Sequence, residues 1–509
     1  MIRLKHSGIT TELPWDGIPV TVSRLLEQAG LYPDHPCGGQ GRCGKCRVAA
    51  KGDLSPAAPE ERRHLSPEEL AAGVRLACLA QVCGPDADIE LPSDGGLLVE
   101  TGGSLHRLAW DPWATGLGLC VDIGTTTVAA YLWDLDRRCR LGVASCKNPQ
   151  ERWGADVVSR LDAALAGHGE DLRTCMVQCL AELASRLCRQ ADRPVSDIGG
   201  AVLTGNTAML YLLRGLDVHD IALAPFRAQH RFGEYVPAAA LGLHWGADCR
   251  IYLPPCLSAY VGADITCGLL ACGILQTDGP ALLADVGTNG EMALRSGDTI
   301  YCCATAAGSA FEGVGISCGS GAVPGAIDAV SVENGGLHVH VIGGGPARSL
   351  CGSGLLDAVA ALRRLERVED SGFMEEDSLP LSGGVSLLRR DIRAFQLAKS
   401  AVCAGVDTLL HAAGCTAPQV RTAWLAGGFG CKLSPESACA VGMLPCGLIP
   451  SVRPAGNTAA MGAALLLCSR RFEAEAAAIV SASRVVELTT DPVFQQRFVE
   501  DMILTEVTA

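Results

Sequence analysis

Apolar and polar residues alternate in short runs over the first 92 residues, a pattern typical of a small domain with short strands and helices. Ile2 and Leu4 alternate with charged neighbours and predict an opening strand, and residues 88–91 predict a closing strand. Between them, residues 21–29 place apolar side chains at helical spacing and predict a short helix. We therefore expect residues 1–92 to form one α/β domain.

A second helix is indicated by Ser66-Pro67-Glu68-Glu69, which combines an N-cap, a proline in the first turn and a glutamate at the third helical position. We expect this helix to carry the chain to Cys78. Residues 93–116 then change in composition: they are polar, contain Gly-Gly and Asp-Pro pairs, and predict a linker.

A strand–turn–strand pattern occurs twice in the rest of the chain. Residues 119–127 and residues 282–291 each contain a run of apolar residues, an aspartate, a turn with glycine and threonine, and the start of a second strand. A repeat with a carboxylate at each turn indicates two related lobes that face each other. We expect the first lobe, the second lobe and a C-terminal tail at residues 117–275, 276–475 and 476–509.

Composition and charge narrow the range of partners. The chain has 509 residues, 48% of them hydrophobic, and a net charge of −14, so it lacks the basic surface that nucleic acids and anionic membranes require. No run reaches the roughly 18 apolar residues of a membrane span, and residues 1–6 show no signal peptide. We expect a cytoplasmic protein whose 25 cysteines are mostly reduced thiols, as in an anaerobic or strongly reducing cell.

Four cysteines have the spacing of an iron–sulfur site. Cys37, Cys43 and Cys46 lie in a glycine-rich loop with the spacing C-x5-C-x2-C, and Cys78 follows in the sequence Arg-Leu-Ala-Cys. Glycines suit this loop because backbone N–H groups must approach the cluster without side-chain bulk. The plant-type [2Fe–2S] loop is one residue shorter. A zinc site is the alternative, but zinc sites usually pair two C-x2-C hooks, and only Cys43 and Cys46 form one.

The two repeated turns carry residues that suit phosphate binding. Threonine hydroxyls and turn N–H groups hold phosphate oxygens, and a nearby aspartate holds Mg²⁺ through water. An apolar strand that runs into two glycines would let the backbone approach a flat ligand closely. The candidate residues are Asp122, Gly124, Thr125 and Thr126 in the first turn, Asp285, Gly287, Thr288 and Asn289 in the second, and Gly427 and Gly428 after the third strand.

These elements resemble two known folds. The cysteine loop with its flanking elements resembles the β-grasp fold of [2Fe–2S] ferredoxins, in the variant seen in adrenodoxin-like members. The two aspartate turns, the Gly-Gly strand and a small-residue helix from Asn457, in that order, resemble the ASKHA fold of sugar kinases, Hsp70 and actin, a duplicated RNase H-like fold. By this resemblance the turns bind the phosphates of ATP with Mg²⁺, and Gly427 and Gly428 contact the adenosine.

The combination of both folds resembles one family, the reductive activators of corrinoid enzymes, in which an N-terminal [2Fe–2S] ferredoxin domain precedes an ASKHA-type domain. The resemblance covers nearly the whole chain. Besides the cysteine loop and the two aspartate turns, it is carried by Asn148-Pro149-Gln150, Gly154-Ala155-Asp156-Val157, Gly205-Asn206-Thr207, Phe311-Glu312-Gly313, Cys351-Gly352-Ser353-Gly354 and Ala426-Gly427-Gly428-Phe429.

Membership in this family implies an ATP-dependent enzyme that returns one electron from its cluster to the inactive Co(II) corrinoid of a methyltransferase system and restores Co(I). The implied partners are a corrinoid (cobalamin-binding) protein, a low-potential electron donor and a second copy of the chain, although the linker here is shorter than the linker domain that helps larger members dimerise. The resemblance also implies the site residues: Cys37, Cys43, Cys46 and Cys78 hold the cluster, and Asp122 and Asp285 position Mg²⁺ and the attacking water.

Three other interpretations fit parts of the sequence. A small-molecule kinase with a regulatory cluster would need a carboxylate base beside a substrate hydroxyl, and no sugar-binding motif is visible. An Hsp70-like binding or maturation module would use ATP only as a timer and would not need the cluster cysteines. The ASKHA-type activators of dehydratases carry a [4Fe–4S] cluster at a dimer interface and lack the N-terminal ferredoxin.

Overall fold

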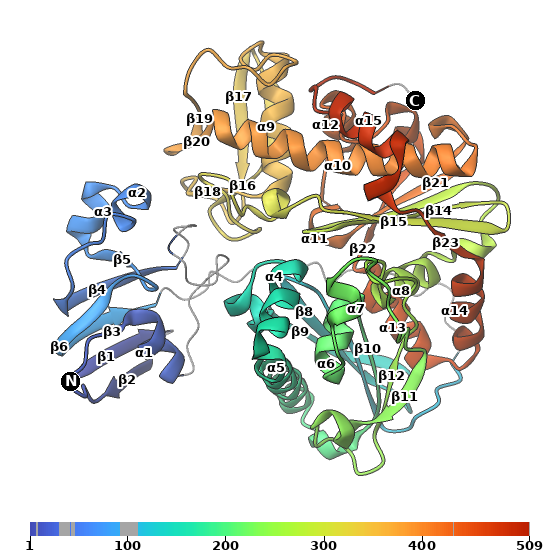
Figure 1. Cartoon of the computed structure of the whole chain (residues 1–509), viewed down its shortest axis with the longest axis horizontal. Coiled ribbons are helices and arrows are strands. Elements are labelled where there is room, and N and C mark those ends of the chain that lie inside the picture. Colours follow the sequence, from blue (N-terminus) through green and yellow to red (C-terminus); the bar gives the residue numbers. More distant parts are fainter. Residues whose placement is uncertain (7–8, 30–40, 42–45, 92–109, 431, 508–509) are drawn as a thin grey trace. The chain divides into compact units, whose positions relative to one another are not determined.

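The computed structural model describes the chain (Figure 1) except for residues 7–8, 30–40, 42–45, 92–109, 431 and 508–509. The chain divides into two compact units, one of residues 1–97 with 149–163 and one of residues 98–148 with 164–509. Among the described helices, none combines the length and the apolar character that a membrane crossing needs. The described cysteines are free thiols except for the disulfide Cys439–Cys446, which agrees with the expectation of mostly reduced cysteines.

The first unit contains a mixed sheet with the strand order β2-β1-β6-β4-β5, and β3 also pairs with β6. Strands β1 and β6 are parallel, and the other neighbours are antiparallel. Helix α1 buries Val22 and Leu26 in a core with Ile2 and Ile89. This fold is the predicted β-grasp fold. Its elements are β1 (Ile2–His6), β2 (Ile9–Leu13), β3 (Val20–Thr21), α1 (Val22–Gln28), β4 (Arg47–Leu54), α2 (Glu61–His64), α3 (Pro67–Ala72), β5 (Val74–Leu76) and β6 (Gln81–Glu90).

The capping box at Ser66 forms as predicted, but its helix is shorter than expected. The Ser66 hydroxyl accepts a hydrogen bond from the Glu69 N–H at 3.2 Å, and the Glu69 carboxylate accepts one from the Ser66 N–H at 2.8 Å. Helix α3 then ends at Gly73, which has a φ of 91°. The prediction that this helix carries the chain to Cys78 is therefore wrong: a left-handed glycine ends the helix, and β5 leads to the cysteine.

A buried ion pair links α2 to β5. The fully buried Glu61 carboxylate accepts hydrogen bonds from Arg75 Nε at 3.0 Å and Arg75 Nη2 at 2.8 Å. It also accepts bonds from the backbone N–H groups of Leu76 and Ala58, both at 2.9 Å. Burial raises the pKa of Glu61, but these hydrogen bonds outweigh burial and hold that pKa below its usual value.

Two six-stranded sheets in the second unit (Figure 1) have the orders β11-β12-β10-β7-β8-β9 and β22-β21-β13-β14-β15-β23 and share the topology of five strands. The sixth strand differs, since β11 is antiparallel to β12 at one edge, whereas β23 is parallel to β15 at the other. In each, three consecutive strands form an antiparallel meander, and two later strands add in parallel beside the first. This is the predicted duplicated RNase H-like arrangement. The strands are β7 (Leu117–Ile123), β8 (Thr127–Asp134), β9 (Cys139–Lys147), β10 (Ile198–Gly205), β11 (Glu234–Pro237), β12 (Arg250–Leu253), β13 (Ala281–Val286), β14 (Gly290–Ser296), β15 (Thr299–Thr305), β21 (Thr422–Ala426), β22 (Val452–Gly456) and β23 (Ser483–Val485).

Helices α8 (Ala263–Cys272) and α13 (Thr458–Cys468) pack closely together, and α8 contacts strands of both sheets. A Cβ at Gly462 would lie 2.0 Å from the Cys267 carbonyl oxygen, so only glycine permits this approach. The small-residue helix expected from Asn457 is confirmed. The other helices of this unit are α5 (Gly169–Gln190), α6 (Thr207–Arg214), α7 (His219–Ala222), α9 (Gly352–Arg364), α10 (Arg389–Ala413), α11 (Gly427–Gly430), α12 (Pro435–Ala440), α14 (Arg471–Ala482) and α15 (Pro492–Glu500).

Two smaller sheets, β17-β16-β18 and β19-β20, lie between β15 and α10 in the sequence. The glycine-rich segment 306–313 forms one short 3₁₀ turn, η6 (Ser309–Glu312), whereas the segment from Leu350 begins α9. Helix α4 (Val157–Ala163) is separated from α5 by an irregular segment in which Gly167 has a φ of 102°. The small strands are β16 (Ala326–Glu333), β17 (Gly336–Val341), β18 (Ser349–Leu350), β19 (Ser378–Ser382) and β20 (Val385–Leu388).

Replacing Glu61 with alanine would leave the Arg75 guanidinium buried without its carboxylate, and such a loss costs about 3–5 kcal/mol. We expect hydrogen–deuterium exchange of β4 to β6 in the whole protein, measured by mass spectrometry, to become roughly two to four orders of magnitude faster. Glu90→Gln, at an exposed position of β6, is the matched control and should not change exchange. Equal exchange in the two variants would contradict a stabilising role for the ion pair.

Candidate functional site

Two of the four predicted cluster cysteines are among the described residues, and they lie together. Cys46 directly precedes β4, Cys78 closely follows β5, and the antiparallel pairing of these strands brings the two ends side by side. Their Sγ atoms are 3.3 Å apart. Tetrahedral bonds of about 2.3 Å to one metal place two sulfurs about 3.7 Å apart, so the pair suits ligation of one iron. Cys37 and Cys43 lie outside the described residues.

The surroundings of the cysteine pair suit a cluster shielded from water. Cys46 is 2% exposed, and its carbonyl oxygen accepts a hydrogen bond from the Ala77 N–H at 2.8 Å. Gly41 has a φ of 70°, and a Cβ there would lie 3.0 Å from the Leu79 side chain. The loop therefore needs glycine at this position, in line with the glycine-rich pattern.

In the second unit, the two predicted phosphate turns face each other. The first joins β7 to β8 and is closed by a hydrogen bond from the Gly124 N–H to the Thr127 carbonyl at 3.0 Å. The second joins β13 to β14, is one residue shorter, and is closed by a hydrogen bond from the Gly287 N–H to the Asn289 carbonyl at 3.0 Å.

The two turns meet through threonine side chains. The hydroxyl oxygens of Thr126 and Thr288 are 3.4 Å apart. The Thr125 hydroxyl accepts a hydrogen bond at 3.1 Å from the side-chain amide of Asn206, which also caps α6. The structure therefore brings both turns and the start of α6 into one place.

The Gly-Gly element lies beside the second turn. Gly427 has a φ of 83°, and a Cβ there would lie 2.5 Å from Asp285 Oδ1, so a larger residue would displace this carboxylate. A Cβ at Gly428 would meet no atom within 4 Å, so the backbone there borders open space. Phe429 stacks on Phe311, with ring centroids 4.4 Å apart and an interplanar angle of 5°.

Four carboxyl groups around these turns have raised pKa values, and burial is the main cause for each. The pKa rises to about 6 for Asp122, about 7 for Asp285 and about 8 for Asp264, and it lies well above the usual range for Glu291. Repulsion among these carboxylates contributes to the rise for Asp264, Asp285 and Glu291. A hydrogen bond from Asn457 Nδ2 at 2.8 Å partly offsets the rise for Asp122. Such a group of oxygen ligands suits Mg²⁺, whose charge would stabilise the ionised forms.

A fifth carboxylate connects the two turns directly. Glu312, at the end of η6, accepts a hydrogen bond from the Thr126 hydroxyl at 2.6 Å and another from the Thr288 N–H at 2.9 Å. Each turn therefore donates to a different oxygen of the same carboxylate.

Several of these residues were not predicted as site residues. Glu291 and Glu312 lie in stretches that carry the family resemblance, so the resemblance could have identified them as site residues. Asn457 was identified only as the start of a helix. Asp264 lies in the first turn of α8, where the surrounding sequence contains no motif that marks it.

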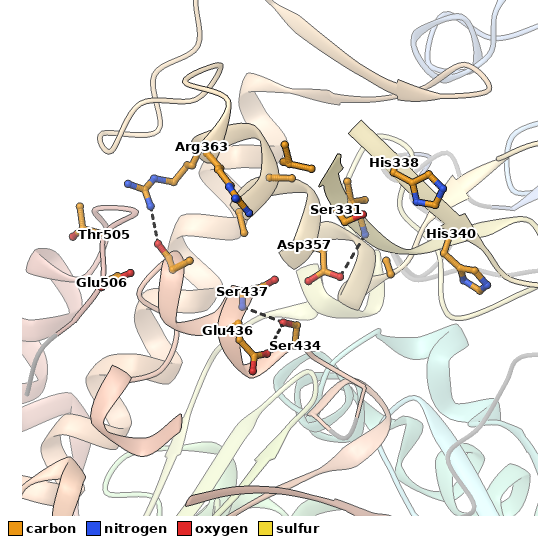
Figure 2. Close-up of a pocket in the computed structure, with 17 residues that line it drawn as sticks. Ser331, His338, His340, Asp357, Arg363, Ser434, Glu436, Ser437, Thr505 and Glu506 are labelled. Carbon is orange, nitrogen blue, oxygen red and sulfur yellow. Dashed lines mark hydrogen bonds between the residues drawn. The ribbon is translucent and has the colours of Figure 1, made fainter. Parts of the chain in front are cut away.

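A hollow of about 820 Å³ lies elsewhere, lined by β16, β17, α9, α12 and the segment Thr505-Glu506 (Figure 2). None of the predicted site residues lines it. The Arg363 guanidinium in this hollow already has a hydrogen-bond acceptor, since its Nη1 donates to the Ala440 carbonyl at 2.6 Å. The candidate site is therefore the pair of turns with their carboxylates.

The raised pKa of Asp264 makes a prediction about stability. Because its folded pKa, about 8, exceeds the ordinary value of 3.8, its stabilising effect is present at low pH and is lost as the pH rises toward 8. Without divalent cations, Asp264→Asn should raise the melting temperature at pH 8 by about 1–2 °C for each kcal/mol of unfavourable burial and repulsion removed, with a smaller effect at pH 5. Differential scanning calorimetry in EDTA measures this.

The exposed variant Asp278→Asn serves as the control for that measurement and should leave both melting temperatures unchanged. A lower melting temperature for Asp264→Asn than for the parent at pH 8 would show that the carboxylate stabilises the unit, contrary to the prediction.

Three family models match this chain in consecutive ranges. A 2Fe-2S iron-sulfur cluster binding domain matches residues 6–83, the RACo middle region matches residues 117–277, and the C-terminal domain of RACo, the ASKHA domain, matches residues 279–509. These matches cover the ferredoxin-type sheet and both sheets of the second unit.

Individual proteins are similar over most of their length. The corrinoid activation enzyme RamQ of Eubacterium limosum is 32% identical over 413 residues, which span 75% of this chain and 69% of that protein. The [Co(II) methylated amine-specific corrinoid protein] reductase of Methanosarcina barkeri is 28% identical over 70% of this chain and 71% of its own. A solved structure titled reductive activator for corrinoid,iron-sulfur protein matches with a TM-score of 0.72 and 26% identity, covering 99% of this chain and 98% of that one. From its ferredoxin domain, its duplicated lobes and these similarities, we conclude that the chain belongs to the RACo family of corrinoid activation enzymes.

Proposed function

We propose that this protein is an ATP-dependent reductive activator, which passes one electron from its [2Fe–2S] cluster to the Co(II) corrinoid of a methyltransferase system and restores Co(I). One observation carries the proposal: a single chain holds both the Cys46–Cys78 pair of a ferredoxin domain and two phosphate turns that meet at Glu312. The names of the similar proteins, a corrinoid activation enzyme and a Co(II) corrinoid protein reductase, support the choice of acceptor.

Coupling to ATP meets a physical requirement of this reaction. Reduction of Co(II) to Co(I) is uphill for an ordinary ferredoxin, because Co(I) is a very strong reductant. For a one-electron couple, a tenfold change in equilibrium corresponds to about 59 mV or about 1.4 kcal/mol. ATP hydrolysis, worth on the order of 10 kcal/mol, would lift one electron by several hundred millivolts on this scale.

Residues of the second unit would bind and orient the nucleotide. The Thr126 hydroxyl and the Thr288 N–H are positioned to donate to phosphate oxygens, and the closed backbone of both turns fixes their direction. Asp122 and Asp285 would hold Mg²⁺ through water, and the missing side chain of Gly427 leaves room for the Asp285 carboxylate. The open space beside Gly428 would receive the adenosine.

The remaining residues of the predicted set would act through the backbone. Gly124 and Gly287 close the two turns, Asn289 accepts the closing bond of the second turn, and Thr125 is held by Asn206. Closure of the two sheets on the bound nucleotide is the hinge motion expected for a ligand held between two such halves.

The cysteines would hold the redox centre and control its exposure. When bound, the [2Fe–2S] cluster stores and donates single electrons. Cys46 and Cys78 would share one iron, and the low exposure of Cys46 would shield that side from water. The proposed partners are a corrinoid (cobalamin-binding) protein as acceptor and a low-potential electron donor.

The experiment is anaerobic and follows the cobalt spectrum after mixing the protein with a reductant, a Co(II) corrinoid protein and Mg-ATP. We expect Co(I) to form only when ATP is present. Cys78→Ser should remove the visible absorption of the cluster and reduce Co(I) formation to background, because one iron loses a thiolate ligand, while Mg-ATP binding persists. Calorimetric titration measures that binding.

Cys83→Ser is the matched control, since Cys83 is an exposed thiol on β6 of the same sheet. It should keep both the absorption and the activity. Activation by Cys78→Ser at the parent rate would instead support a binding or maturation module that uses ATP as a timer. Absence of ATP-dependent Co(I) with every available corrinoid protein would disprove the proposal.

A further inference from the structure

The Glu312 carboxylate already occupies the groups that a phosphate would need. Its Oε2 accepts the Thr126 hydroxyl at 2.6 Å, and its Oε1 accepts the Thr288 N–H at 2.9 Å. Oε1 also lies 3.6 Å from the position that a Cβ would take at Gly287. A carboxylate and a phosphate both present two anionic oxygens to such donors, and charge-assisted hydrogen bonds of this kind are stronger than neutral ones. The two anions therefore cannot both take these donors at full strength.

We propose that Glu312 is an internal substitute for phosphate, which a nucleotide phosphate displaces when it binds between the two turns. This inference rests on the proposed function only in taking the two turns as the nucleotide site. In the structure described here, Glu312 holds the turns together with its own charge. A phosphate that reaches the Thr126 hydroxyl and the Thr288 N–H takes over both bonds and expels the carboxylate from them.

Displacement of the Glu312 carboxylate would affect the Gly-Gly element through direct packing contacts. Phe311, which directly precedes Glu312, stacks on Phe429 of α11. A Cβ at Gly352, the first residue of α9, would lie 2.0 Å from the Phe311 carbonyl oxygen and 2.9 Å from the Phe429 ring. Because η6 fits so closely against both α9 and α11, Glu312 cannot move far without moving Phe311. Arrival of a phosphate at the turns is thereby linked to the position of α11.

Two simpler roles for Glu312 make different predictions. If it were only a structural link between the turns, its loss would loosen the turns and weaken the binding of every anion. If it were only a Mg²⁺ ligand, its loss would weaken binding of Mg-nucleotide and leave free phosphate unaffected. If Glu312 is a substitute for phosphate, its removal has the opposite effect on anion affinity. The donors become free, and anions bind more tightly.

The test is calorimetric titration of the whole protein with inorganic phosphate, with pyrophosphate and with Mg-ADP. Glu312→Ala should bind all three about tenfold more tightly than the parent, which corresponds to a parent site blocked about nine-tenths of the time. Glu312→Gln keeps an acceptor but loses the charge, and should fall between the two. Glu333→Gln, an exposed carboxylate at the end of β16, should bind as the parent does. Unchanged or weaker binding by both Glu312 variants would overturn the proposal.

Hydrogen–deuterium exchange tests the route to α11. In the parent, pyrophosphate should change exchange in the peptides that cover 306–316 and 425–434. In Glu312→Ala, those peptides should already exchange at the ligand-bound rate without ligand. The unliganded variant could instead exchange at the rate of the unliganded parent and still respond to pyrophosphate. That result would show that Glu312 does not hold η6, and it would contradict the proposed link from the turns to α11.

These outcomes separate the inference from the proposed function. If the parent fails to bind Mg-ATP while Glu312→Ala still gains affinity for phosphate and pyrophosphate, the ATP role fails and the substitution by Glu312 stands. If ATP-dependent Co(I) formation is observed but the Glu312 variants bind anions no better than the parent, the proposed function stands and the inference about Glu312 fails.

Discussion

Repulsion among buried carboxylates is the constraint on which the second unit depends. Burial is the main cause of the raised pKa values of Asp264, Asp285 and Glu291, and the charge of Asp122 contributes to the rise in all three. Burial also strengthens the repulsion by removing water that would screen the charges. Protons, hydrogen-bond donors or a divalent cation relieve it, and the donors visible near Asp122 and Glu291 are few: the Asn457 amide and the Gly262 N–H. The close packing of α8 and α13 holds these groups together despite the repulsion. A divalent cation bound at this acidic site would relieve the repulsion.

Much of this architecture could be predicted from local sequence signals. The capping box at Ser66 and the repeated strand–aspartate–turn pattern are determined by neighbouring residues, and both form as expected. The facing of the two turns also followed, since a repeated element with a carboxylate at each copy implies a shared site. The termination of α3 at Gly73 did not follow, because periodicity continued past the point where a left-handed glycine ended the helix.

The contacts that were missed are those between residues far apart in the sequence. Glu312 lies 186 positions from Thr126, and nothing near either residue indicates that they meet. Asn457 and Asp122 are separated by 335 positions, and the amide was explained by its capping of α13 alone. Such pairs depend on how the sheets stack, which a single sequence does not encode in any local pattern. The roles of Cys37 and Cys43 stay predictions, because these residues lie outside the described part of the chain.

The duplication of the strand–turn–strand element has a consequence for the orientation of a ligand bound between the two turns. Thr125 and Thr288 hold corresponding places in the two turns, as do Asp122 and Asp285, so a ligand between them would meet similar groups from both sides. Two carboxylates break this symmetry. Glu291 pairs with Asp285 where the apolar Ala129 pairs with Asp122 in the first copy, and Glu312 comes from a segment after the second meander only. The two sides of the site therefore differ in charge, although the backbone of the two turns is similar. A phosphate chain that enters such a frame would have one preferred orientation, and its terminal group would always face the same side.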